Sequence, residues 1–156
     1  MAIPKIDKQN LPFHRARILA LDETTPARWG GMNAAAMVSH LRAMVELSLG
    51  DIEVPVVVPR IIGRPLGLLF FYVITRWPRG RKGSKPPIPA LCPVPSLAFE
   101  EERQRLLAAL DRFVARQESD PGAKTPNPLL GPITLERWTH VHGVHFRHHY
   151  RQFGVE

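Results

Sequence analysis

Histidine is concentrated near the end of the chain, where five of the seven histidines fall between positions 140 and 149. If this segment is a helix, His145 and His149 lie four residues apart and point to the same side, with Cβ atoms about 6 Å apart. Two imidazoles at that separation can bind one metal ion. Burying their ring nitrogens in an apolar stripe would be costly unless something bound them. The spacing therefore favours a metal site, on a stripe that includes three further side chains, Trp138, His142 and Gln152.

A third ligand is predicted from a second inward-facing stripe. Met37, Leu41, Met44 and Val45 recur at steps of three and four, which is the period of a helix. His40 lies one turn from Met37 and from Met44, so it belongs to this stripe. Three neutral imidazoles suit Zn, Ni, Cu or Fe, and we expect Zn or Ni. Three protein ligands leave at least one coordination position open, which is typical of catalytic rather than structural zinc sites.

The remaining histidines have weaker claims. His142 lies on the same stripe as His145 and could support a ligand or replace one, so its role stays open. His140 and His148 are predicted to point away and to be solvated, and His14 to be a surface or packing residue. Two histidines four residues apart on a helix are more often ordinary surface residues. The dense cluster and the inward position of His40 argue against that reading here.

Four helices are predicted to position these side chains. Capping residues precede the second and fourth at Asn33 and Thr134, and glycines that stop a helix follow them at Gly50 and Gly154. The predicted helices cover residues 10–22, 33–50, 97–118 and 134–153.

Proline-rich connections separate the helices. Nine prolines fall between residues 51 and 97, which we interpret as one long crossover between the second and third helices. Residues 119–133 are interpreted as a second proline-rich link. The sum is an all-α four-helix bundle that forms a single domain over residues 1–156.

Composition excludes some classes of function. The net charge of +7 raises nucleic acid or an anionic substrate as a partner. However, much of the charge lies in residues 76–85, which we interpret as a solvated basic loop, and nucleic-acid binding is not expected. Arg64 and Arg76 interrupt the apolar segment 61–77, which leaves it too short to span a bilayer. With no secretory signal and a single cysteine, Cys92, the chain is expected to be cytoplasmic, with no membrane contact.

Two stretches resemble a known family. Arg28-Trp29-Gly30, followed by Met37-Val38-Ser39-His40-Leu41, resembles the start of the second helix in DinB-like (YfiT-like) metal-binding bundles. Residues 128–134, Trp138 and residues 145–154 closely resemble the last helix of one bacterial subfamily that is labelled a domain of unknown function. The order of elements matches from about residue 10 to residue 156. The resemblance implies an up-down-down-up bundle, and it carries over three metal ligands, His40, His145 and His149.

The resemblance also implies an activity. Better-studied relatives join low-molecular-weight thiols to electrophiles or isomerise maleylpyruvate with a thiol cofactor, and others look like metal-dependent hydrolases. We therefore expect a metal-dependent enzyme, a thiol S-transferase that uses a metal-activated thiolate, a low-molecular-weight thiol and a small-molecule substrate. A homodimer is compatible with the resemblance by analogy.

Two alternatives stay open. A hydrolase would need a carboxylate base, but Glu46 is six residues from His40 and faces elsewhere. The chain could also be a non-catalytic metal-binding or interaction module. Gly143 departs from the family pattern, in which an aromatic residue is common, and should weaken the helix by up to about 1 kcal/mol relative to alanine.

Overall fold

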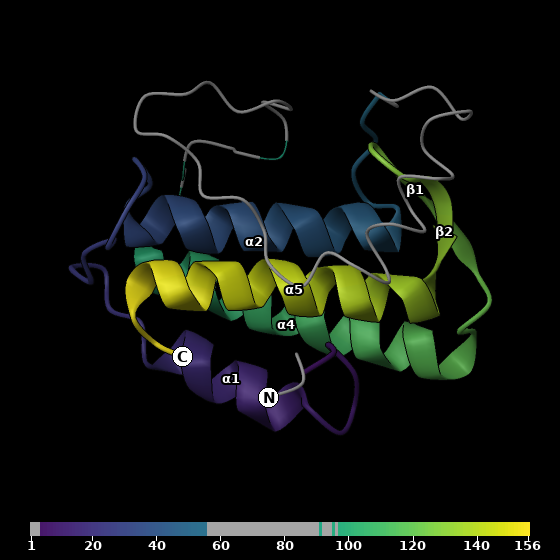
Figure 1. Ribbon diagram of the computed structural model, residues 1–156, viewed down its shortest axis with the longest axis horizontal. Coiled ribbons are helices and arrows are strands. Elements are labelled where there is room, and N and C mark those ends of the chain that lie inside the picture. The colour runs from purple at the N-terminus through teal and green to yellow at the C-terminus, as the bar shows by residue number, and fades with distance from the viewer. Residues whose placement is uncertain (1–3, 56–90, 92–94, 96) are drawn as a thin grey trace.

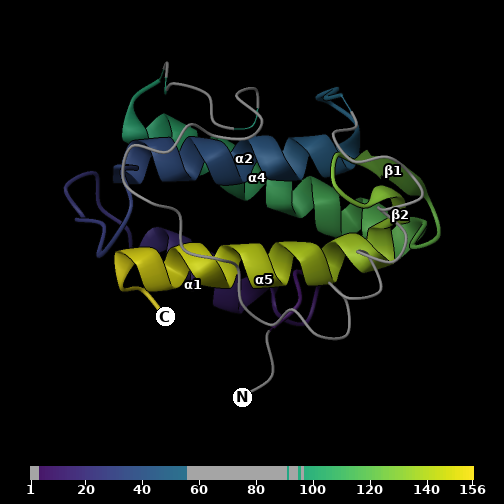
Figure 2. The same cartoon turned by 45° about the horizontal axis from the view of Figure 1, so that its top comes forward.

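The computed structural model describes residues 4–55, 91, 95 and 97–156. Within them, four helices and two strands follow in the order α1, α2, α4, β1, β2 and α5. The helices lie lengthwise beside one another, and the strands lie at the end where α4 stops and α5 begins (Figures 1 and 2). The bounds are α1 Leu11–Leu19, α2 Ala34–Leu49, α4 Phe99–Ser119, β1 Lys124–Asn127, β2 Gly131–Thr134 and α5 Leu135–Phe153.

Local capping fixes both ends of the two helices that carry the histidines. The Asn33 side chain accepts a hydrogen bond of 2.8 Å from the backbone N–H of Ala36, and α2 ends at Gly50 in the left-handed conformation. At α5, the Thr134 hydroxyl accepts from a backbone N–H three residues on, and Gly154 ends the helix in the same left-handed way. These ends agree within a residue with the predicted helices 33–50 and 134–153, because capping depends on neighbouring residues alone.

The prediction of an all-α bundle is wrong, because residues 124–134 contain a two-stranded antiparallel sheet. Pro126 and Pro132 suggested a structureless link, but they lie opposite each other in the ladder and face solvent. Both strands are sheet edges, where proline is tolerated since it need not donate to a ladder. Thr125 and Ile133 point inward, so the hairpin still buries one face.

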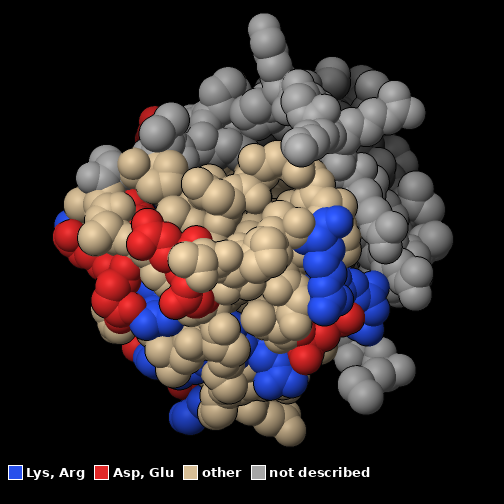
Figure 3. All heavy atoms as spheres, turned by 90° about the vertical axis from the view of Figure 1, so that its left-hand side faces the viewer, with Lys and Arg blue, Asp and Glu red and all other residues tan. Residues whose placement is uncertain are grey.

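Part of the predicted organisation cannot be compared with the structure. The crossover, residues 51–97, lies mostly outside the described residues, and the basic loop 76–85 and Cys92 lie wholly outside them. Among the helices described, none has the length and apolar character needed to cross a membrane. In Figure 3, which views the end of the molecule away from the hairpin, the described surface carries both acidic and basic side chains.

The core lies between α2, α4 and α5. In Figure 1, α2 and α5 run in opposite directions, with α4 packed behind them. Burial of these apolar side chains supplies the main stabilising term. The larger fully buried side chains include Trp138, Tyr150, Phe113, Phe146, Met37 and Leu41.

Polar contacts join the elements at defined positions. The Arg42 guanidinium on α2 donates a 2.9 Å hydrogen bond to Glu102 on α4, whose side chain is fully buried. The Thr125 hydroxyl donates to the carbonyl of Ser48 at 3.0 Å and so ties the hairpin to α2. These bonds fix α2 against both neighbours. Because His40 lies on α2, these bonds also fix its position.

Candidate metal centre

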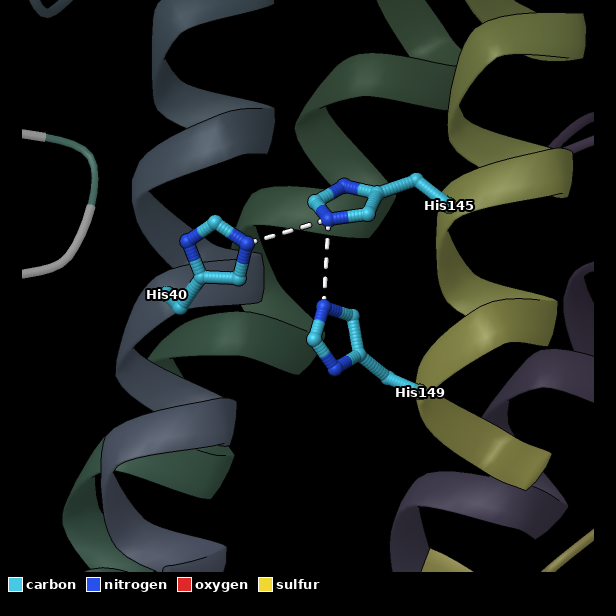
Figure 4. Close-up of side chains that lie close together, drawn as sticks. All are labelled: His40, His145 and His149. Atoms are coloured by element: carbon cyan, nitrogen blue, oxygen red, sulfur yellow. Dashed lines mark hydrogen bonds between the residues drawn. The ribbon is translucent and has the colours of Figure 1, made fainter. Parts of the chain in front are cut away.

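Three histidine rings converge between α2 and α5. His40 comes from α2, and His145 and His149 come from successive turns of α5, with their rings directed toward one another (Figure 4). The Nε2 atom of His145 lies 3.0 Å from that of His40 and 3.1 Å from that of His149. The ligand atoms of all three lie within 4.8 Å of one another. The structure thus brings together the three residues selected from the sequence.

The cluster is shielded from solvent. His40 is 9% exposed, and His145 and His149 are each 5% exposed. Burial is the main cause that lowers the pKa of His40 and holds the pKa values of His145 and His149 well below their ordinary value. All three imidazoles are therefore neutral at pH 7, which is the form in which a nitrogen lone pair can bind a metal.

Hydrogen bonds on the far side of two rings fix their tautomers. The Nδ1 atom of His40 contacts the backbone carbonyl of Leu91, which can only accept, so Nδ1 carries the proton. The Nδ1 atom of His149 lies 2.8 Å from Oε1 of Gln152, and it also donates. Both neutral rings consequently present an Nε2 lone pair to the centre of the cluster.

Hydrogen bonding within the cluster cannot satisfy all three ring nitrogens at once, and the arrangement is compatible with a metal ion. His145 Nε2 carries at most one proton, so it can donate to His40 or to His149 but not to both. A cation between the three nitrogens would satisfy them together. With metal–nitrogen bonds of about 2.0–2.1 Å, neighbouring donors lie about 3.3 Å apart in a tetrahedral site and about 2.9 Å apart in an octahedral one. The separations of 3.0 and 3.1 Å from His145 to its two neighbours fall within that interval, and the ligand atoms of all three residues lie within 4.8 Å of one another.

A loop before α2 holds the outer side of His149. The Gln152 side-chain nitrogen donates a 2.8 Å hydrogen bond to the backbone carbonyl of Trp29, and the backbone N–H of Arg28 donates to the carbonyl of Gln152 at 2.7 Å. Gly30 has a φ of 81°, and a Cβ atom there would lie 2.8 Å from the Gln152 nitrogen. The loop is therefore shaped closely around this amide.

His142 lies outside the cluster of three histidines. It is fully buried, and its Nε2 atom lies 2.9 Å from the hydroxyl oxygen of Ser48. Its ring stacks on Trp138, with ring centroids 5.1 Å apart and planes tilted by 23°. Burial lowers the pKa of His142 to about 3, so this ring is neutral as well. Of the two roles left open by the sequence, replacement of a ligand does not agree with this orientation.

The other histidines do not join the cluster either. His14 is fully buried, donates from Nε2 to the carbonyl of Lys5 at 3.1 Å and accepts at Nδ1 from the Tyr150 hydroxyl at 3.0 Å. It is thus a packing residue. His140 and His148 are half-buried rather than solvated.

Charged groups considered at the sequence level face elsewhere. Both carboxylate oxygens of Glu46 accept from Arg42, at 2.9 and 2.8 Å, as expected for a side chain that points away from His40. The group of ligand atoms found among the described residues contains three imidazoles and no carboxylate.

Gln152, Leu91 and Trp29 are the residues that sequence reasoning missed. Gln152 was placed on the histidine stripe, but no role followed from that position. Its neighbour Trp29 is 123 residues away in the chain, and Leu91 is 51 residues from His40. The resemblance of Arg28-Trp29-Gly30 to a known family marked this loop, but it assigned Trp29 no contact with Gln152.

Comparison with known proteins gives a single result. A family model described as "Protein of unknown function (DUF1569)" matches residues 5–155, and the chain therefore belongs to this family. This confirms the prediction of an uncharacterised domain family. No curated protein and no solved structure matches the chain.

Proposed function

From this family membership and the three converging imidazoles, we propose that the chain binds one divalent transition-metal ion through the Nε2 atoms of His40, His145 and His149. The observation that carries the proposal is that two fixed lone pairs and a third ring nitrogen meet within 4.8 Å. Neutral imidazole is a good ligand for Zn and Ni, which we propose as the ions. The low exposure of all three rings supports a site from which bulk water is largely excluded.

We further propose that the family belongs to the DinB-like superfamily and that the protein transfers a low-molecular-weight thiol to an electrophilic small molecule. The resemblance of residues 28–30, 37–41 and 145–154 to that superfamily supports this assignment. A bound divalent ion would hold a thiol as its thiolate, the nucleophilic form. Cys92 lies outside the described residues, and we propose that the thiol comes from a cofactor.

Hydrolysis is the weaker candidate. It would call for a general base near the ion, and carboxylates serve that role most often besides histidine. The cluster includes no carboxylate among the described residues, and Glu46 is engaged by Arg42. A metal-binding module without turnover is the remaining alternative, and activity measurements separate it from the enzyme.

Metal content tests the first proposal. The chain is purified without a histidine tag, incubated with Zn or Ni, dialysed and analysed by mass spectrometry for metals. We expect about one ion per chain in the wild type and a loss in His145→Ala. His140→Ala is the matched control, because it removes a histidine from the same helix outside the cluster. A wild type that retains no metal, or a His140→Ala that loses it, would contradict the proposed ligand set.

Activity tests the second proposal. The metal-loaded chain is offered a panel of low-molecular-weight thiols with an electrophile that changes absorbance on S-alkylation. We expect a rate above the uncatalysed reaction that disappears in His145→Ala and persists in His140→Ala. A chain that holds its ion but accelerates neither thiol transfer nor ester hydrolysis would be a binding module.

A further inference from the structure

We infer that Gln152 is a positioning residue of the metal centre, whose side-chain amide joins His149 to the backbone of Trp29 and so decides which nitrogen of His149 faces the other ligands. This inference rests on the proposed function, since it assigns a role to a residue beside one of the proposed ligands. Gln152 itself lies outside the cluster.

The orientation of the amide follows from its two partners. The carbonyl of Trp29 can only accept, so the NH₂ group of Gln152 must face it, at 2.8 Å. Oε1 then faces the other way, toward Nδ1 of His149 at 2.8 Å. An acceptor at that place requires the proton on Nδ1 and leaves the lone pair on Nε2, 3.1 Å from Nε2 of His145.

The loop before α2 also packs closely against this amide. Gly30 adopts a φ of 81°, a conformation that strains any residue with a Cβ atom. A Cβ atom there would also lie 2.8 Å from the Gln152 nitrogen. The backbone N–H of Arg28 donates to the carbonyl of Gln152 at 2.7 Å, so main chain and side chain are held together. Gln152 is only 5% exposed.

A purely structural role would predict a different pattern. If Gln152 only packed the loop against α5, an apolar side chain of similar length would serve, and His149 would keep its tautomer. If it positions His149, removing the acceptor frees the ring to place its proton on either nitrogen. Mutation of a residue that orients a ligand in this way typically lowers metal affinity by about 10–100-fold.

Three variants separate these readings. Gln152→Met keeps the length and removes both hydrogen bonds. Gln152→Glu keeps an acceptor for His149 but removes the donor to Trp29. Gly30→Ala leaves Gln152 in the sequence but displaces its amide, and Gly31→Ala is the matched control, since a Cβ there meets nothing within 4 Å.

The measurements are Zn affinity by chelator competition, the His149 tautomer in the metal-free chain from ring ¹⁵N shifts, and thermal stability. We expect Gln152→Met and Gly30→Ala to weaken Zn binding by about 10–100-fold and to mix the tautomers. Gln152→Glu should lose stability yet keep the Nδ1–H tautomer and most of the affinity. Gly31→Ala should match the wild type.

The outcomes separate the inference from the proposal beneath it. Wild-type affinity and an unchanged tautomer in Gln152→Met would overturn the inference, and Gly30→Ala decides the matter if Gln152→Met does not fold. Affinity that merely follows stability across all variants would also overturn it. A wild type that binds neither Zn nor Ni would refute the proposed function instead, and the tautomer would then still show whether Gln152 holds the ring.

Discussion

The hydroxyl oxygen of Ser48 on α2 lies 2.9 Å from Nε2 of His142, which is on α5 one turn from His145. Ser48 donates its own proton to the carbonyl of Val45 at 2.7 Å, so it accepts from His142, and that Nε2 atom carries a proton. The buried Nδ1 atom of His142 has no hydrogen-bond partner within the described part of the chain. His142 thus links two helices and lies outside the group of ligand atoms formed by His40, His145 and His149.

The first prediction is that His142→Gln retains the metal. A glutamine amide can still donate toward Ser48, so we expect unchanged metal stoichiometry and a stability loss of about 1 kcal/mol. His145→Gln, the same change three residues along α5, should lose the ion. Metal analysis of the two variants side by side checks this. Loss of metal from both would return His142 to the ligand set.

Gly143→Ala provides the second prediction. A Cβ at this position would lie 2.6 Å from the backbone carbonyl oxygen of Pro4, where the N-terminal segment crosses α5. Backbone atoms cannot give way as a flexible side chain can, so we expect a loss of about 1–3 kcal/mol in the free energy of unfolding. Urea denaturation measures it, with faster proteolysis at the N-terminal segment as a second readout.

Helix propensity alone predicts the opposite sign for this variant. Alanine is favoured over glycine by about 1 kcal/mol within a helix, so a more stable Gly143→Ala would mean that the segment at Pro4 does not pack here. Gly31→Ala serves as the control substitution, because a Cβ there has open space. The sequence predicts only that Gly143 weakens the helix, whereas the structure places this glycine at a close crossing of two segments.

The third prediction concerns the ion pair between α2 and α4. Arg42 is the hydrogen-bond partner of Glu102, a carboxylate with no exposed surface whose second oxygen has no hydrogen-bond partner among the residues described. Arg42→Met would leave this buried charge without its partner, and we expect a loss of about 3–5 kcal/mol in the free energy of unfolding. Adding Glu102→Leu should recover most of it, because the stranded carboxylate is then removed.

An exposed pair supplies the control for that cycle. Arg105 and Glu101 also pair at 3.1 Å, but their side chains are 55% and 51% exposed. Arg105→Met should therefore change the free energy of unfolding by no more than about 0.5 kcal/mol. Equal losses in Arg42→Met and Arg105→Met would show that burial of Glu102 adds nothing.

The fourth prediction is a pH dependence that involves His14. Burial lowers the pKa of His14 from 6.5 to about 4. Between these values the unfolded chain binds a proton that the folded chain does not, so stability falls as the pH falls. From pH 7 to pH 5 this one residue should cost about 2 kcal/mol.

The measurement compares wild type and His14→Gln by urea denaturation at both pH values, with a chelator present to keep the proteins metal-free. The wild type should lose about 2 kcal/mol more than the variant over this interval. Parallel losses would mean that His14 titrates alike in the folded and unfolded chains.

Local signals predicted what depends on neighbours in the chain. The ends of α2 and α5 follow from Asn33, Gly50, Thr134 and Gly154, and the shared direction of His145 and His149 follows from a spacing of four residues. His40 required an inward-facing stripe and a resemblance. Neither could show that the Nε2 atom of His40 lies close to that of His145, because the offset of two helices along their axes depends on long-range packing.

The hairpin was missed for a related reason. Its strands are only four residues long, too short for a clear alternation, and each contains a proline. Thr125 and Ile133 become recognisable as one inward-facing pair only when the strands are aligned. The bond from Gln152 to Trp29 is still less accessible, since it joins segments 123 residues apart.

The hairpin fixes the position at which α5 begins. Thr125 anchors it to α2, and the backbone N–H groups of Leu135 and Glu136 close it against the segment after α4, at 2.9 and 3.1 Å. Removing one residue between Ile133 and Leu135 would shift α5 by about 1.5 Å along its axis and rotate it by about 100°. Both histidines would then turn away from His40. Natural length variation in relatives should therefore collect at the hairpin tip, between Asn127 and Gly131, and spare its base.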